Sequence, residues 1–193
     1  MEWLLGIDTR ILYFINGLNT PFLDEVMWII SKPMLSIPIY LFFIYLFYTL
    51  DGKNFWRPLL AVILVVTLAD RISVECFKDV VCRLRPSHTE GILENLHFYV
   101  KSNGKVYQGG LYGFVSSHAA NTFGVAVFMM LYAKRKYVTA IALVWASVVS
   151  LSRVYLGVHF PTDILAGGAL GALLGWFVFW GYKKLSKKYG WVN

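Results

Sequence analysis

Three short clusters of the sequence hold the side chains best suited to chemistry. In the last of them His159 and Asp163 are four residues apart, close enough on one helical turn for the carboxylate to contact an imidazole nitrogen. A carboxylate that fixes the tautomer and stabilises the imidazolium is what a nucleophilic or basic histidine requires. Arg153 lies six residues before His159 and adds a cation. The alternative interpretation is that Asp163 only caps a helix beginning near Pro161, beside an unrelated histidine.

The first cluster contains Lys78 and Arg85, followed directly by Pro86. Seven residues are close to two helical turns, so the spacing predicts that both cations share one stripe of a helix, about 10 Å apart in height. Pro86 then ends that helix. Two such cations can hold an anion from two sides, whereas cations snorkelling to a membrane interface would give the same pattern.

The middle cluster is Ser116, Ser117 and His118, where a long apolar helix is expected to begin. A helix N-terminus offers free N–H groups and the positive end of the helix dipole to a phosphate. Ser116 adds a hydroxyl donor, and His118 titrates near neutral pH and can pass a proton. An N-cap serine beside an interfacial histidine is the alternative.

The composition indicates that membrane helices carry these clusters. Of the 193 residues, 58% are hydrophobic and only 15% are charged, whereas soluble domains average about 25% charged residues. This argues against a soluble globular protein, and the hydrophobicity argues against disorder. A helix needs about 20 apolar residues to cross a bilayer. Five apolar runs, each the centre of a slightly longer helix, predict five spans at residues 34–50, 58–69, 111–133, 137–152 and 164–182.

The N-terminal apolar run, residues 11–23, is broken by Asn16, Gly17, Asn19 and Pro21. This pattern favours two short amphipathic helices at the membrane interface over a sixth span. The predicted fold class is therefore all-α: an integral-membrane helical bundle with about five transmembrane helices plus short N-terminal interfacial helices. We expect a single domain over residues 1–193, with interfacial helices in 1–32, the transmembrane core in 33–182 and a basic cytoplasmic tail in 183–193.

The basic residues predict the orientation. The chain has 18 Lys and Arg against 11 Asp and Glu, a formal charge of +7, which in a membrane protein indicates positive loops and an anionic ligand rather than a nucleic-acid surface. Half of the basic residues fall on the side opposite the three clusters, which should be cytoplasmic. Because the number of basic residues is equal on the two sides, the excess of Lys and Arg expected in cytoplasmic loops determines the orientation only if the other basic residues are held in a site. The nine are Lys53, Arg57, Lys134, Arg135, Lys136, Lys183, Lys184, Lys187 and Lys188.

Topology brings the three clusters together. The end of the second span, the start of the third and the turn between the fourth and fifth all face the same side of the membrane. Three cations, a helix N-terminus, two histidines and one carboxylate then converge, which suits phosphoryl transfer through a phosphohistidine. Because a single acid belongs to the group and its cations would repel a divalent ion, we expect no metal site.

The three clusters resemble the signature of the type 2 phosphatidic acid phosphatase (PAP2) family. That signature reads K-x6-RP, PSGH and SR-x5-H-x3-D, and the segments here are KDVVCRLRP, SSH and SRVYLGVHFPTD. The first and third parts match in full. The second departs from it at Val115, in place of Pro, and at Ser117, in place of Gly. The signature and its spans cover about residues 56–182.

This resemblance implies a role for each residue and neither a metal nor a cofactor. His159 would attack phosphorus, Asp163 would orient it, and His118 would protonate the leaving oxygen and later activate water. The family's membrane members commonly have six spans, so here the first would be missing or reduced to the interfacial helices. The phosphate oxygens would be held by Lys78, Arg85, Ser116, the backbone of Ser117 and Arg153.

The expected function is hydrolysis of a phosphate on an anionic membrane lipid, at the outer, periplasmic-type face of a bacterial inner (cytoplasmic) membrane. Candidate lipids are undecaprenyl diphosphate, phosphatidate, phosphatidylglycerophosphate and lipid A. One rival, a vanadium haloperoxidase, has a similar oxyanion site but is typically soluble. A second rival, a non-catalytic lipid-phosphate binder or transporter, would need the cations but not the His159–Asp163 pair. The expected partners are the bilayer and the lipid, and no oligomeric state is predicted.

The remaining polar and small residues receive structural interpretations. His88 and His97, in the long segment 86–112, are expected to be solvated, and Cys76 and Cys82 to pack without forming a disulfide. The glycines of the last span, at positions 167, 168, 171 and 175, predict close helix packing. An ion pair of Arg71 with Asp70 or Glu75 is expected inside the second span, and residues 107–110 at the rim of the site.

Overall fold

The computed structural model describes residues 2–191 and consists of helices joined by short connections, with one long loop. The N-terminal part holds α1 (Glu2–Asn16) and α2 (Pro21–Ser31), then the short 3-10 turn η1 (Pro33–Ser36). The bundle itself is made by α3 (Ile37–Asp51), α4 (Trp56–Arg71), α6 (Ser117–Ala133), α7 (Lys136–Tyr155) and α8 (Pro161–Lys188).

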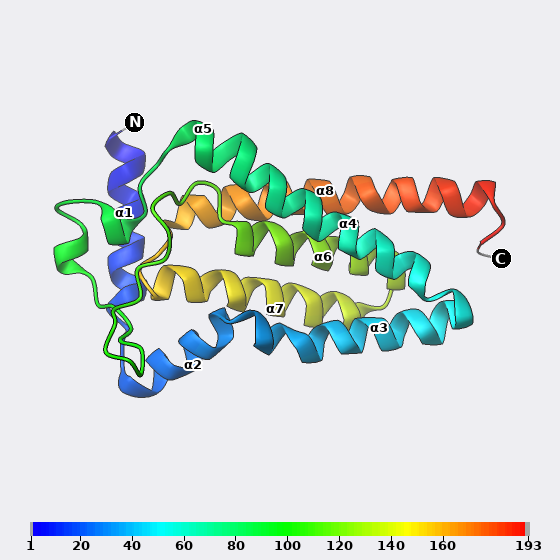
Figure 1. Cartoon of the computed structure of the whole chain (residues 1–193), viewed down its shortest axis with the longest axis horizontal. Coiled ribbons are helices and arrows are strands. Elements are labelled where there is room, and N and C mark those ends of the chain that lie inside the picture. Colours follow the sequence, from blue (N-terminus) through cyan, green and yellow to red (C-terminus); the bar gives the residue numbers. More distant parts are fainter. Residues whose placement is uncertain (1, 192–193) are drawn as a thin grey trace.

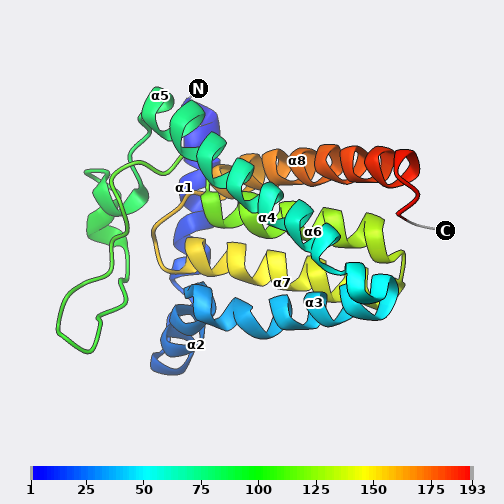
Figure 2. The ribbon, with the colours of Figure 1, turned by 45° about the vertical axis from the view of Figure 1, so that its right-hand side comes forward.

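The five bundle helices run alongside one another, whereas α1 lies across one end (Figure 1). The turned view agrees, with α2 and the long loop at the same end as α1 (Figure 2). The connections α3–α4 and α6–α7 and the C-terminal end of α8 lie at the far end (Figure 1). Each of the five predicted apolar runs thus overlaps one bundle helix, and the all-α fold class is confirmed for the described residues.

Three segments of the described chain are long and apolar enough to cross a membrane: Pro33–Asn54, Lys136–Tyr155 and Pro161–Lys188. The prediction for residues 111–133 is wrong at its start, because α6 begins only at Ser117. The backbone before Ser117 forms hydrogen bonds with another segment instead of joining the helix. Leu111 O accepts from Arg85 N at 3.0 Å, and Gly113 N donates to Arg83 O at 2.8 Å. These bonds hold the stretch extended.

The prediction that Lys78 and Arg85 share one helical stripe is also wrong. After α4 the helix widens into a π-helical segment, η3 (Ile72–Lys78), and one further turn, α5 (Asp79–Val81), ends at Cys82 in a left-handed conformation with φ 51°. The helix therefore stops before Arg85, which lies in extended backbone paired with the segment before α6. Lys78 approaches the site from a helix and Arg85 from a loop.

Close packing of α6 on α8 brings the first turns of both helices together. A side chain at Gly171 would collide with the carbonyl oxygen of Ala120, and one at Gly175 with that of Gly124. Further along, a buried apolar core joins α3, α4, α6, α7 and α8, with Phe43, Phe47, Phe128, Met129 and Phe179 among its members. The glycine stripe therefore packs helices as the sequence predicts.

Substituting Gly171 by valine is expected to destabilise the protein. The side chain meets backbone rather than a movable side chain, so α6 and α8 must separate, and overpacking of this kind costs about 1–3 kcal/mol or more. Thermal unfolding in detergent should show a lower midpoint. The matched control is Gly181→Val on the same helix, where nothing lies within 4 Å of the added carbon; an equal loss there would contradict close packing as the cause.

Two further predictions concern side chains near the end of α4. Arg71 and Glu75 do form an ion pair, at 2.8 Å, but on an exposed helix face. Cys76 and Cys82 are free thiols, as expected, yet both are exposed, so the prediction that they pack inside is wrong. The widened turns of η3 and the early helix end leave both on the surface.

Candidate active site

The end of the bundle under α1 holds the chemically capable side chains. Arg153 lies in the last turn of α7, His159 in the following loop, and Asp163 in the first turn of α8. Ser116 caps α6, its side chain accepting from Ala119 N at 3.5 Å, and His118 follows within the first turn. Pro161 starts α8, where the lack of an N–H costs nothing.

His159 is 1% exposed, and its ring position follows from two neighbours. Arg85 Nη1 lies 3.0 Å from His159 Nε2. A guanidinium can only donate, so Nε2 accepts with its lone pair and the ring proton resides on Nδ1. Nδ1 faces Asp163 Oδ2 at 3.4 Å. Burial, together with the charges of Arg85, Arg153 and Lys78, lowers the pKa of His159 well below its usual value, so the imidazole is neutral.

Asp163 is fully buried and held on every side. Its Oδ2 accepts from Phe160 N at 3.0 Å, which caps α8, and its Oδ1 accepts from Arg83 Nη1 at 2.9 Å. Its carbonyl oxygen accepts from Ser116 N at 2.9 Å, tying the start of α8 to the cap of α6. Asp163 Oδ2 is thus held in a fixed position beside the His159 ring.

Arg83 is a part of the site that sequence reasoning missed. Besides Asp163 it contacts Asp8 of α1, with Nη2 donating to Oδ2 at 2.7 Å, and its guanidinium stacks over the Phe160 ring at 4.1 Å. Asp8 is only 2% exposed and also accepts from Thr162 N at 2.9 Å. Once the segment is known to be extended, the spacing of Arg83 and Arg85 is informative, because alternate residues of an extended chain share a face.

Three cations surround His159 and His118. Arg85 also donates from Nη1 to Val158 O at 3.2 Å, and Lys78 Nζ donates to Ser117 Oγ at 2.6 Å. Arg153 is 3% exposed, donates to the Tyr107 hydroxyl at 2.6 Å, and leaves its Nε without a partner. Burial and the nearby charge of Arg153 lower the pKa of Arg85 to about 10. Like charges held together away from water form a site for an anion.

The structure therefore brings all eight sequence-predicted site residues to one end of the bundle. Two of them differ in detail from the expectation. The Ser117 hydroxyl contacts Lys78 and, at 2.7 Å, Ser73, while its backbone lies in the first turn of α6. Ser116 acts as the N-cap, and the proton of its hydroxyl remains available to donate.

The long loop, residues 86–112, is largely exposed, and several of its side chains contact α2 and the site. His97 Nε2 lies 2.8 Å from Asp24 Oδ2, and Tyr107 packs edge-on against Trp28 at 4.7 Å while accepting from Arg153. His88 stays near its neighbour Ser87, at 3.1 Å. His97 is exposed, as the sequence predicts, and it also contacts Asp24, while Tyr107 at the rim of the site agrees with the sequence.

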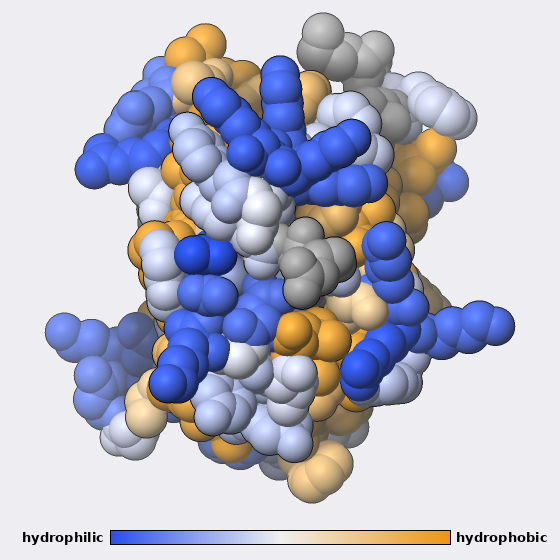
Figure 3. Space-filling view, turned by 90° about the vertical axis from the view of Figure 1, so that its right-hand side faces the viewer, coloured by the Kyte–Doolittle hydropathy of each residue, from blue (hydrophilic) through white to orange (hydrophobic). Residues whose placement is uncertain are grey.

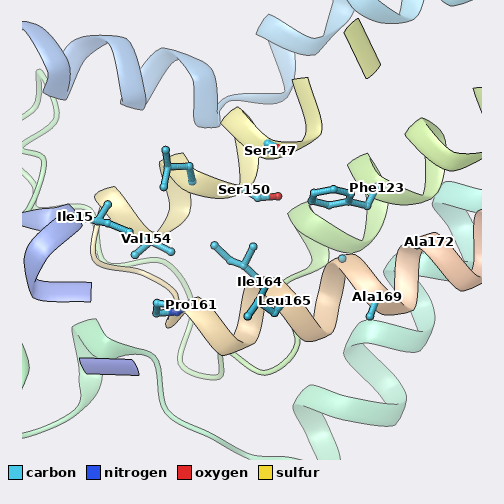
Figure 4. Close-up of a pocket in the computed structure, with 12 residues that line it drawn as sticks. Ile15, Phe123, Ser147, Ser150, Val154, Pro161, Ile164, Leu165, Ala169 and Ala172 are labelled. Atoms are coloured by element: carbon cyan, nitrogen blue, oxygen red, sulfur yellow. The ribbon is translucent and has the colours of Figure 1, made fainter. Parts of the chain in front are cut away.

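An apolar pocket of about 540 Å³ lies between α6, α7 and α8, away from the histidines. Figure 4 shows Phe123, Val154 and Ile164 around it, with Ile15 of α1 at one end. A second, smaller cavity, of about 220 Å³, is lined by Ser117 and His118. Of the two, only the smaller reaches the chemical groups.

The fold and this site define a helical membrane phosphatase. The chain belongs to the PAP2 superfamily, whose family model matches residues 55–187. This confirms the predicted family and that the protein is an enzyme.

Several proteins resemble the chain over most of its length. It is 35% identical to the lipid A 4'-phosphatase of Bacteroides thetaiotaomicron, covering 97% of this chain and 82% of that one. It is 32% identical to phosphatidylglycerophosphatase B of Bacillus subtilis, over 71% of this chain and 63% of the relative. The crystal structure of the transmembrane PAP2 type phosphatidylglycerolphosphate phosphatase from Bacillus subtilis superposes with a TM-score of 0.67 at 26% identity, covering 97% and 88% of the two chains. These likenesses indicate a bacterial membrane protein.

Proposed function

We propose that the chain removes the phosphate of an anionic membrane lipid through a phosphohistidine formed on His159. The observation that carries this is the neutral imidazole with its Nε2 lone pair among the cations and its Nδ1 toward Asp163. Lipid A is the first candidate substrate, because relatives at 35% and 34% identity over nearly the whole chain are named lipid A 4'-phosphatases. Phosphatidylglycerophosphate and undecaprenyl diphosphate follow from the more distant relatives.

In the proposed reaction, His159 Nε2 attacks phosphorus as the bond from phosphorus to the lipid oxygen breaks. Once the anionic phosphate of the substrate offsets the charges of the surrounding cations, His118 takes up a proton and gives it to that oxygen. Water then attacks the phosphohistidine, transferring a proton to His118, and the P–N bond breaks to release phosphate. Lys78, Arg85, Arg153, the Ser116 hydroxyl and the Ser117 N–H hold the phosphoryl oxygens, where charge spreads in the transition state.

The test is phosphate release by detergent-purified protein from a panel of lipid mono- and diphosphates, in the presence of EDTA. We expect release that persists in EDTA, because every proposed role belongs to a side chain or to the backbone N–H of Ser117, and none to a metal. Lipid binding without release from any member of the panel would favour the non-catalytic binder or transporter. Release that stops in EDTA and returns with a divalent metal would contradict the metal-free mechanism.

We further propose five membrane spans in a single domain. Three are the long apolar segments described above, and the other two are α4–η3 and α6, while α1 and α2 lie at the membrane interface. The nine basic residues of the predicted cytoplasmic side lie at the end opposite the site, where hydrophilic side chains project (Figure 3). Several basic residues at the other end are engaged, namely Arg71, Lys78, Arg83, Arg85, Arg153 and, over the Trp28 ring, Lys101. This supports an active site on the outer face of the inner membrane, with residues 183–193 in the cytoplasm.

A reporter fused after Asn193 checks this orientation. A fluorescent protein that matures only in the cytoplasm is expected to be bright in intact cells, because the tail carries four lysines on the positive side. A secreted alkaline phosphatase at the same position should be inactive. The opposite pair of results would place the site on the cytoplasmic face.

A further inference from the structure

Of the phosphate-holding residues, only Ser117 lines the small cavity beside His118, so most of this cavity has no role in the proposed reaction so far. It lies between α2, η1 and the start of α3 on one side and α4, α6 and α7 on the other, with a volume of about 220 Å³. Asp70 of α4, Asn121 of α6 and Lys32 before η1 contribute polar groups to its wall, and Tyr40 closes it from α3. We call this space the His118 cavity.

The direction of the proposed reaction points the leaving group into this space. In phosphoryl transfer the attacking and leaving atoms lie roughly in line on opposite sides of phosphorus. The buried His159 attacks from one side, and His118, the proton donor to the leaving oxygen, lines the cavity. The group attached to that oxygen therefore enters the His118 cavity.

The polar groups of the cavity fit a neutral partner with hydrogen-bonding groups. Asn121 lies almost one helical turn beyond His118, and its Oδ1 is buried without a hydrogen-bond partner. An unpartnered buried acceptor is costly, and a hydroxyl or amide donor on a ligand would relieve that cost. Asp70 and Lys32 supply one charge of each sign, in contrast to the three cations around the phosphate.

We propose that the His118 cavity is a subsite for the sugar ring that carries the phosphate, with Asn121 accepting a hydrogen bond from the ring and Asp70 disfavouring a second phosphate. A volume of about 220 Å³ equals the room of about seven waters at roughly 30 Å³ each, which suits one ring rather than a whole lipid headgroup. This inference rests on the proposed function. It adds that the enzyme prefers a phosphorylated sugar to a lipid diphosphate, and it assigns that preference to residues outside the family signature.

Two variants test the subsite. Asn121→Leu keeps the size of the side chain and removes the acceptor, and Asp70→Asn removes one negative charge at an exposed position. The substrates are lipid A bearing its phosphate, phosphatidate and undecaprenyl diphosphate, each in the same detergent micelles. Ser147→Ala, on the exposed side of α7 in the other pocket, is the control.

We expect Asn121→Leu to lower kcat/KM for lipid A at least ten-fold more than for phosphatidate. Asp70→Asn should raise kcat/KM for undecaprenyl diphosphate several-fold relative to lipid A, because a repulsion is removed. Ser147→Ala should leave the ratios of the three substrates unchanged. If Asn121→Leu folds poorly and loses all activity, the ratio of kcat/KM for undecaprenyl diphosphate to that for lipid A in Asp70→Asn still tests the subsite.

Three outcomes overturn the subsite. Equal changes in kcat/KM for all three lipids in both variants would show that the cavity does not distinguish between leaving groups. Native protein that releases phosphate from phosphatidate or undecaprenyl diphosphate but not from lipid A would refute the sugar subsite while leaving the lipid phosphatase intact. Native protein that releases phosphate from none of the three would remove the proposed function and the subsite with it.

Discussion

Phosphate release is expected to fall by at least about 10⁴-fold when His159 is replaced by alanine, since removing a nucleophile leaves only the binding contributions to catalysis. The His159 imidazole is buried, and its Nε2 lone pair lies among the three cations. A water molecule taking its place in the alanine variant would not be held in the same orientation. The measurement is the rate of phosphate release from the best lipid of the panel. In the native enzyme, rapid acid-free quenching after mixing with labelled lipid should also capture label on the protein.

His118→Ala separates the two steps of the same reaction. The variant should still accept label on His159, slowly, but release it more slowly than the native enzyme, because in the proposed reaction His118 activates the water of the second step. The matched control is His88→Ala, which changes a histidine of the long loop that contacts its neighbour Ser87. If His159→Ala retained the native rate, the assignment of the nucleophile would be wrong.

The second large effect is expected from Arg83→Met. Arg83 joins Asp8 to Asp163, and in the proposed mechanism Asp163 orients His159. Removing the guanidinium leaves two buried carboxylates without their shared cation, which should lower the free energy of unfolding by about 2–3 kcal/mol, given that Arg83 is partly exposed. It should also lower kcat about 10²-fold, since a small misplacement of a reacting group has effects of that size.

A positioning role and a purely structural role of Arg83 differ in the quantity that changes. If Arg83 positions Asp163, each folded enzyme molecule still forms the phosphohistidine, but slowly, and KM is nearly unchanged because the three phosphate-holding cations remain. If Arg83 only supports folding, the fraction of molecules that can be labelled falls and the rate per labelled molecule stays native. Arg71→Met, which breaks an exposed ion pair in the preceding helix, is the control and should change neither quantity.

The sequence was informative about the site because the ends of apolar runs determine which residues share a membrane face. His118, Arg153, His159 and Asp163 lie within a turn or two of helix ends, so their placement followed from where α6, α7 and α8 begin and end. The close packing of α8 could also be predicted, because small residues at helical spacing in membrane proteins commonly mark close contacts between helices.

Other parts of the site depend on structure that no local pattern shows. The position of Arg85 depends on a helix that ends in a left-handed residue, Cys82, for which the apolar pattern gives no sign. The contact of Arg83 with Asp8 joins residues 75 positions apart, and the Tyr107 contact with Arg153 depends on where a long loop docks. Such long-range pairs follow from packing rather than from spacing along the chain.

The ion pair of Arg83 with Asp8 has a consequence for the synthesis and membrane insertion of the protein. Asp8 is synthesised well before Thr162, which donates to it, and before Asp163, which shares Arg83 with it; both of these residues open α8. During synthesis the nucleophile therefore cannot be oriented until α8 has been inserted and has packed against α6. Under the proposed mechanism, a nascent chain that still lacks α8 would therefore lie in the membrane without hydrolysing the lipid phosphate.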